Sequence, residues 1–123
     1  MKECLIVFIG GGCGSILRYL ISLLPLCKTN THFPIATLLC NITGCLCIGL
    51  FYALSEKFGW SQSTRLLLTT GLCGGFTTFS TFSNETLQLL KSTTLSASVL
   101  YVTTSILLGI GMTFLGKTLG ERI

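Results

Sequence analysis

Long apolar stretches separated by short polar segments form the main pattern of this chain. Four stretches, at about 4–26, 33–55, 66–90 and 92–116, each exceed the roughly 20 residues that a helix needs to cross the hydrocarbon core of a bilayer. The second and fourth contain no charged residue. The pattern predicts an all-α membrane protein in which residues 1–123 form a single domain of four transmembrane helices.

The third stretch differs from a uniform apolar helix. Residues 74–83 read Gly-Gly-Phe-Thr-Thr-Phe-Ser-Thr-Phe-Ser. Adjacent glycines weaken a helix, so we predict a break near Gly74 and Gly75. Such a break would free backbone carbonyls, which are natural ligands for a hard cation such as Na⁺. Three phenylalanines recur at every third residue and are predicted to lie along one side of a helix: Phe76, Phe79 and Phe82.

Two pairs of glycines have the spacing that allows helix backbones to approach closely in a membrane. Gly10 and Gly14 form the first pair, and Gly71 and Gly75 form the second. Four slender helices make a poor pore alone. We therefore predict a homo-oligomer.

The polar groups predicted to face the interior are mainly hydrogen-bond donors. Asn41 lies in the middle of the second stretch, and Tyr101 and Ser105 share one face of the fourth. Taken alone, a mid-span amide such as Asn41 joins helices more often than it binds a ligand. The edge of an aromatic ring is positive, so Phe79 and Phe82 can offer ring-edge hydrogens to a small anion. Without a full positive charge at mid-span, an anion is held weakly enough to leave, as conduction requires. These groups predict a donor-lined path for a small anion.

The net charge of +4 is explained by residues that flank the apolar stretches and anchor them at the lipid surface, so we expect no nucleic-acid partner. Five basic residues fall with the two termini and the middle loop: Lys2, Lys57, Arg65, Lys117 and Arg122. Lys28 and Lys91 fall on the opposite side. The bias favours both termini in the cytoplasm, and insertion in both orientations stays open. Arg18 lies inside the first stretch, where it faces protein, water or a helix end, or else extends to the interface.

Other function classes fit the chain less well. The seven cysteines include no Cys-x-x-Cys pair, which disfavours a redox enzyme or a zinc site, and most lie where a thiol behaves as a small hydrophobe. A small four-span multidrug or cation exporter fits the length. It would need an acidic residue inside the first stretch for proton coupling, whereas Glu3 lies at the terminus. A packing subunit without transport is a third alternative.

Three motifs carry a resemblance to a known family. They are Gly-Leu-Cys-Gly-Gly-Phe-Thr-Thr-Phe-Ser-Thr-Phe-Ser-x-Glu at 71–85, Gly-Gly-x-x-Gly-x-x-x-Arg-Tyr at 10–19 and Pro-x-x-Thr-Leu-x-x-Asn-x-x-Gly at 34–44. In this order they resemble the signature of the Fluc/CrcB family of fluoride-specific ion channels. The resemblance implies a multi-pass protein of the cell membrane, not an enzyme. It implies passive export of F⁻, which lowers fluoride toxicity.

The resemblance also implies an assembly and a set of site residues. The assembly is an antiparallel, dual-topology dimer with two fluoride pores, formed with itself or with an oppositely oriented paralogue. The fluoride pathway would comprise Phe79, Phe82, Asn41, Ser80, Thr81, Tyr101 and Ser105, with Gly109 where a further serine can occur. Backbone carbonyls of Gly74 and Thr77 would hold a structural Na⁺ at the dimer centre, which is not transported. Arg18 and Glu85 would support the vestibule.

Overall fold

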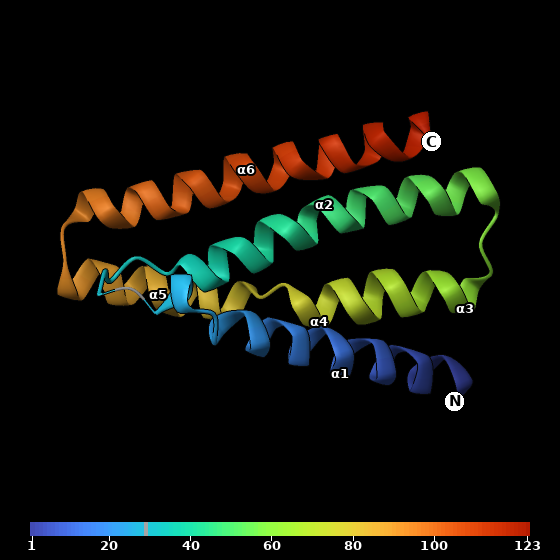
Figure 1. The fold of residues 1–123 in the computed structure, drawn as a ribbon, viewed down its shortest axis with the longest axis horizontal. Helices are drawn as coiled ribbons and strands as arrows, with labels where there is room; N and C mark the ends of the chain where they lie inside the picture. Colours follow the sequence, from blue (N-terminus) through green and yellow to red (C-terminus); the bar gives the residue numbers. More distant parts are fainter. Residues whose placement is uncertain (29) are drawn as a thin grey trace.

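The fold is built from helices, in agreement with the predicted all-α class (Figure 1). The computed structural model describes residues 1–28 and 30–123. Three of its helices are long: α1 (Lys2–Ser22), α2 (Ile35–Phe58) and α6 (Leu95–Arg122). The shorter elements are a 3₁₀ turn η1 (Pro25–Cys27), α3 (Gln62–Arg65), the π-helix η2 (Leu66–Cys73), α4 (Gly74–Phe76) and α5 (Phe79–Ser92).

The chain crosses the molecule four times in alternating directions. Figure 1 shows α1 and the succession α3 to α5 running one way, while α2 and α6 run the other way. Both termini therefore lie at the same end of the molecule, as an even number of spans requires. Between α2 and α6 the third crossing is made by several short segments rather than by one long helix.

Proline and glycine set the ends of two helices. Leu24 is extended (φ −62°, ψ 141°) because the residue before a proline avoids the helical region, so α1 ends at Ser22 rather than near residue 26. Pro34 immediately precedes α2, at a helix start, where proline's lack of an N–H costs nothing. At the other end of α2, Gly59 adopts a left-handed conformation (φ 59°) and its N–H bonds to the Ser55 carbonyl.

The predicted glycine pairs pack against each other within one chain. A Cβ atom on Gly14 would overlap the carbonyl oxygen of Leu72 and the backbone nitrogen of Phe76. A Cβ atom on Gly10 would likewise meet the backbone of Gly71, and one on Gly75 would overlap the Gly11 carbonyl oxygen. α1 and the third crossing therefore touch backbone to backbone, and these pairs supply no argument for a second copy of the chain.

Glycines also bring α2 and α6 together. A Cβ on Gly49 would overlap the Thr113 carbonyl oxygen, and one on Gly116 would overlap the Leu46 carbonyl oxygen. Along both helices the contacts advance in the same direction, so α2 and α6 are parallel.

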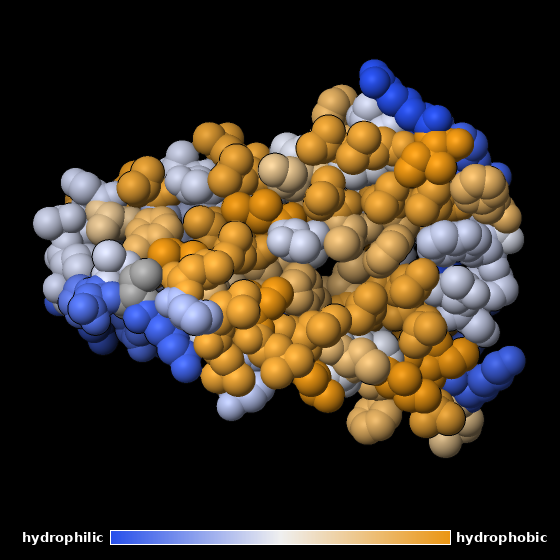
Figure 2. Space-filling model, in the orientation of Figure 1, coloured by the Kyte–Doolittle hydropathy of each residue, from blue (hydrophilic) through white to orange (hydrophobic). Residues whose placement is uncertain are grey.

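Apolar side chains cover the outside of the molecule rather than a large interior. The buried hydrophobic residues among those described are Cys40, Ala53, Cys73, Leu89 and Tyr101. Figure 2 shows hydrophobic residues over the middle of one face and hydrophilic residues towards its ends. In the described part of the chain, α1, α2 and α6 are long and apolar enough to cross a membrane. Lipid is the environment in which such a surface is stable.

We predict that Gly14→Val destabilises the protein, because its side chain has no space beside the Leu72 carbonyl. Overpacking of this kind costs about 1–3 kcal/mol, which would lower the Tm in detergent by several degrees. The matched control is Gly12→Val, because Gly12 has no atom within 4 Å of a built Cβ. Equal melting temperatures for the two variants would contradict the packing described here.

Candidate functional site

The helical path of the third crossing is interrupted at Thr77 and Thr78. Thr77 (φ −82°, ψ 157°) and Thr78 (φ −151°, ψ 117°) are extended, and α5 begins at the next residue. The Thr77 hydroxyl donates to the Cys73 carbonyl (2.9 Å), which closes the preceding helical turn. Gly74 keeps helical dihedral angles (φ −63°, ψ −37°). The interruption therefore follows the two glycines instead of falling on them.

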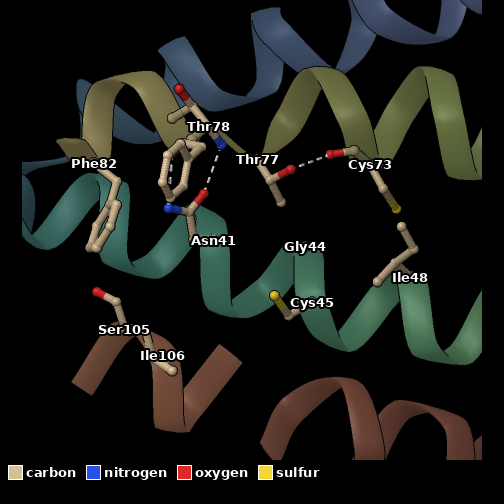
Figure 3. A pocket seen from close by; sticks show the side chains of 11 residues that line it. Asn41, Gly44, Cys45, Ile48, Cys73, Thr77, Thr78, Phe82, Ser105 and Ile106 are labelled. Atoms are coloured by element: carbon tan, nitrogen blue, oxygen red, sulfur yellow. Dashed lines mark hydrogen bonds between the residues drawn. The ribbon is translucent and has the colours of Figure 1, made fainter. Parts of the chain in front are cut away.

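Asn41 of α2 holds the extended backbone of Thr78. Its Nδ2 donates to the Thr78 carbonyl (3.2 Å), and its Oδ1 accepts from the Thr78 N–H (2.8 Å) (Figure 3). In a continuous helix, the Thr78 N–H would bond to the carbonyl of Gly74 four residues earlier. Because Asn41 takes that N–H, the Gly74 carbonyl loses its usual helical partner.

A cluster of hydroxyl groups caps the start of α5. The Thr78 Oγ1 accepts from the Thr81 N–H (3.2 Å) and donates to the Thr81 Oγ1 (3.1 Å). It also lies 3.3 Å from the Ser80 Oγ. The first turn of α5 thus has the partial positive charge of a helix N-terminus, and the predicted pathway residues Ser80 and Thr81 lie there.

Arg18 links α1 to the third crossing just before the interruption. Its Nε donates to the Gly75 carbonyl (3.3 Å), to which the Ser15 hydroxyl also donates (3.4 Å). Arg18 lines a cavity of about 310 Å³ together with Thr81 and Glu85. Of the two sequence interpretations, the structure favours the guanidinium facing protein and a cavity.

A cavity of about 340 Å³ lies beside the interruption, between α2, α5 and α6 (Figure 3). Four predicted pathway residues line it: Asn41, Phe79, Phe82 and Ser105. The Ser105 Oγ is buried and has no hydrogen-bond partner among the described residues, so its O–H is available to a guest. Ser80, Thr81 and Tyr101 are not among the residues that line this cavity.

The aromatic rings continue from the cavity towards the start of α2. Phe79 and Phe82 have ring centroids 5.7 Å apart, and Phe82 and Tyr101 are 5.2 Å apart. Phe33 meets Tyr101 edge to face at 5.5 Å. Phe33 was not among the residues predicted from the sequence, where its place directly before the second motif was the available signal.

The prediction that three phenylalanines share one side of a helix is wrong. Phe76 belongs to α4, and Phe79 and Phe82 belong to α5 beyond the interruption. Phe76 lines a separate apolar cavity with Leu17 and Phe51. The extended residues Thr77 and Thr78 interrupt the helical repeat between Phe76 and Phe79, so a spacing of three no longer places these rings on one side.

Glu85 joins α5 to both α2 and α6. Its Oε1 accepts from the Thr37 hydroxyl (2.9 Å), and its Oε2 accepts from the Tyr101 hydroxyl (3.0 Å). Tyr101 is 0% exposed, and Thr37 is 5% exposed. The Tyr101 O–H is therefore engaged by a carboxylate. Thr37, which belongs to the second motif, lies one helical turn before Asn41, and this spacing places both residues on the same side of α2.

Comparisons with known proteins agree along nearly the whole chain. The family model described as CrcB-like protein, Camphor Resistance (CrcB), matches residues 5–117. A Phocaeicola vulgatus protein named fluoride-specific ion channel FluC is 49% identical over 121 residues, which are 98% of this chain and 100% of the relative. Relatives named in the same way are 44% identical in Flavobacterium psychrophilum (100% of both chains) and, as FluC 2, in Bacillus cereus (98% of both).

We predict that Asn41→Asp destabilises the interruption, because a carboxylate oxygen would face the Thr78 carbonyl in place of the donating Nδ2. A buried polar group left without its partner costs about 1–3 kcal/mol. The Tm should fall, and hydrogen exchange around Thr78 should accelerate. Asn84→Asp is the control, because Asn84 is an exposed amide on α5. If Asn41→Asp and Asn84→Asp lowered the Tm and accelerated hydrogen exchange equally little, the role assigned to Asn41 would be contradicted.

Proposed function

The chain belongs to the CrcB family, and from this membership we propose that it is a fluoride-specific ion channel of the cell membrane. F⁻ would leave the cytoplasm passively, driven by the negative interior, and fluoride toxicity would fall. The proposal is for a channel and not for an enzyme. It is supported by full-length relatives that are named fluoride-specific ion channels.

One structural observation carries this proposal: the cavity beside the interruption offers donors without a full charge. Its polar lining includes the Asn41 amide and the unpartnered Ser105 hydroxyl, and no Lys, Arg, Asp or Glu lines it. Phe79 and Phe82 add ring edges, which are positive. F⁻ is small and strongly hydrated, so it needs donors to replace water. Without a fixed cation it is bound weakly enough to move on.

We further propose that the third crossing spans the membrane as one broken helix and that the channel is an antiparallel dimer. The partner would be a second copy of the chain or an oppositely oriented paralogue. The extended residues 77–78 support the broken span, because non-helical backbone at this depth requires protein or a cavity around it. Phe79 is 79% exposed beside the cavity, where a second copy would cover it.

A structural Na⁺ held by the carbonyls of Gly74 and Thr77 fits the same segment. The Gly74 oxygen has lost the Thr78 N–H to Asn41, and carbonyl oxygens are suitable ligands for a hard cation. Two carbonyls from each copy would supply four oxygen ligands at the centre of the dimer. The bound cation would neutralise converging carbonyl dipoles and join the two copies, and it would not be transported.

The exporter alternative has less support. In the described part of α1, Glu3 is the acidic residue, and it lies in the first turn of the helix. Glu85 lies deeper, but both its oxygens accept hydroxyl donors. The full-length relatives are named as channels rather than exporters.

We predict that Phe79→Ile or Phe82→Ile slows fluoride efflux from proteoliposomes, because a branched aliphatic side chain has no positive ring edge. A barrier raised by about 1.4 kcal/mol slows passage about tenfold. A fluoride electrode would report efflux in Na⁺ buffer, with chloride as the rejected anion. Phe8→Ile is the control, because Phe8 is 76% exposed on α1, away from the cavity. Wild-type fluoride flux in both cavity variants would contradict the assignment.

We also predict that Na⁺ raises the Tm of the purified protein relative to N-methylglucamine. A ligand that binds only the folded state at about 100 times its Kd adds about 2.7 kcal/mol. Fluoride flux should depend on Na⁺ in the same concentration range. Thr77→Ser should keep the effect, because the proposed ligand is the backbone carbonyl. A Tm independent of Na⁺ would argue against the sodium site while leaving fluoride conduction intact.

A further inference from the structure

The cavity beside the interruption is the middle member of a series of three. Thr78 lines both this cavity and the one of about 310 Å³ that contains Arg18. On its other side, Cys45 and Ser105 line both the middle cavity and a third cavity of about 570 Å³. Because they share lining residues, the three cavities adjoin one another in space. They form a row from the end of α1 to the last turns of α6.

The third cavity follows α6 from Ser105 to Lys117. Its α6 lining includes Ser105, Gly109, Thr113 and Lys117, so it extends over about three helical turns. At Gly109 a Cβ would lie 3.5 Å from the Cys45 Sγ, so α2 and α6 are close together there. Lys117 lies near the C-terminal end of α6, and Figure 1 shows that α6 ends at the same end of the molecule as the N-terminus.

Lys117 is the charged residue in the lining of this third cavity. The Thr113 hydroxyl also lines it, but it donates to the Gly109 carbonyl (3.0 Å). Its hydrogen is therefore engaged within α6. Lys117 is exposed, and its ammonium group has no hydrogen-bond or ion-pair partner in the part of the chain that the structure describes. Within the lining of this cavity, the full positive charge that can attract an anion is therefore that of Lys117.

We propose that Lys117 is the anion-recruiting charge at this mouth of the conduction path, with the third cavity as its entrance. The inference rests on the proposed fluoride conduction. Arg18 occupies the corresponding place in the cavity at the opposite end of the series. An anion would then meet a cation at either mouth, with Glu85 beside Arg18 at one of them, and only uncharged groups in the middle cavity.

The effect of Lys117 should depend on salt, because an exposed charge acts through a solvent that screens it. The Debye length is about 30 Å at 0.01 M ionic strength and about 3 Å at 1 M. A single charge about 4 Å from an anion in water contributes about 1 kcal/mol, which changes the local anion concentration about fivefold. A lysine that only anchors α6 at the lipid surface would not give a flux that depends on salt in this way.

The experiment compares Lys117→Gln with Lys117→Arg and with Lys57→Gln in proteoliposomes. Lys57→Gln removes the same charge from the same end of the molecule, at a side chain that donates to the Glu121 carbonyl (3.2 Å) and lines none of the three cavities. Initial fluoride efflux is measured at low and at high concentrations of an impermeant salt, with Na⁺ kept constant. Gel filtration checks that each variant is folded.

We expect Lys117→Gln to slow efflux about fivefold at about 10 mM ionic strength and to approach wild type near 1 M. The efflux rates of Lys117→Arg and Lys57→Gln should match the wild-type rate at both ionic strengths. Equal rates for Lys117→Gln and wild type, or a reduction that salt leaves unchanged, would overturn the assignment of Lys117 alone. A wild-type protein that passed no fluoride would overturn both this inference and the proposed function.

Discussion

The reciprocal pair of hydrogen bonds between the Asn41 amide and the Thr78 backbone is the interaction on which the site depends. An extended residue between two helices would leave an N–H and a C=O without partners, at a cost of about 1–3 kcal/mol each. Asn41 satisfies both groups at once. It thereby separates α4 from α5, releases the Gly74 carbonyl and fixes the direction in which Phe79 and Phe82 leave the chain.

The rest of the bundle holds that arrangement in place from two sides. Backbone contact at Gly14 and Gly75 presses α1 against the third crossing, and Arg18 adds a hydrogen bond to the Gly75 carbonyl. On the other side, Glu85 accepts hydroxyls from Thr37 and Tyr101 and so ties α5 to α2 and α6. Because hydrogen bonds and backbone contacts hold the helices together, the apolar side chains can face lipid.

The distribution of polar groups suits the passage of an anion. The Asn41 amide, the Ser105 hydroxyl and the rings of Phe79 and Phe82 are among the groups that line the middle cavity, while Arg18 with Glu85 and, on the other side, Lys117 line the neighbouring cavities. A fixed cation in the middle would bind an anion too tightly for release, and the absence of donors would exclude it. In this family member the Tyr101 hydroxyl donates to the Glu85 carboxylate, so the unpartnered Ser105 hydroxyl is the α6 donor that lines the middle cavity.

The sequence by itself determined the all-α class and the close approach of the glycine pairs. These properties follow from hydrophobic length and from local sterics, which depend on neighbouring residues. It also identified Asn41, Phe79, Phe82 and Ser105, which the structure brings to one cavity. Only the tertiary structure decided that the interruption falls at Thr77 and Thr78, because the amide that stabilises it comes from another helix. The separation of Phe76 and the engagement of Tyr101 by Glu85 likewise depend on partners distant in the chain, which local periodicity does not encode.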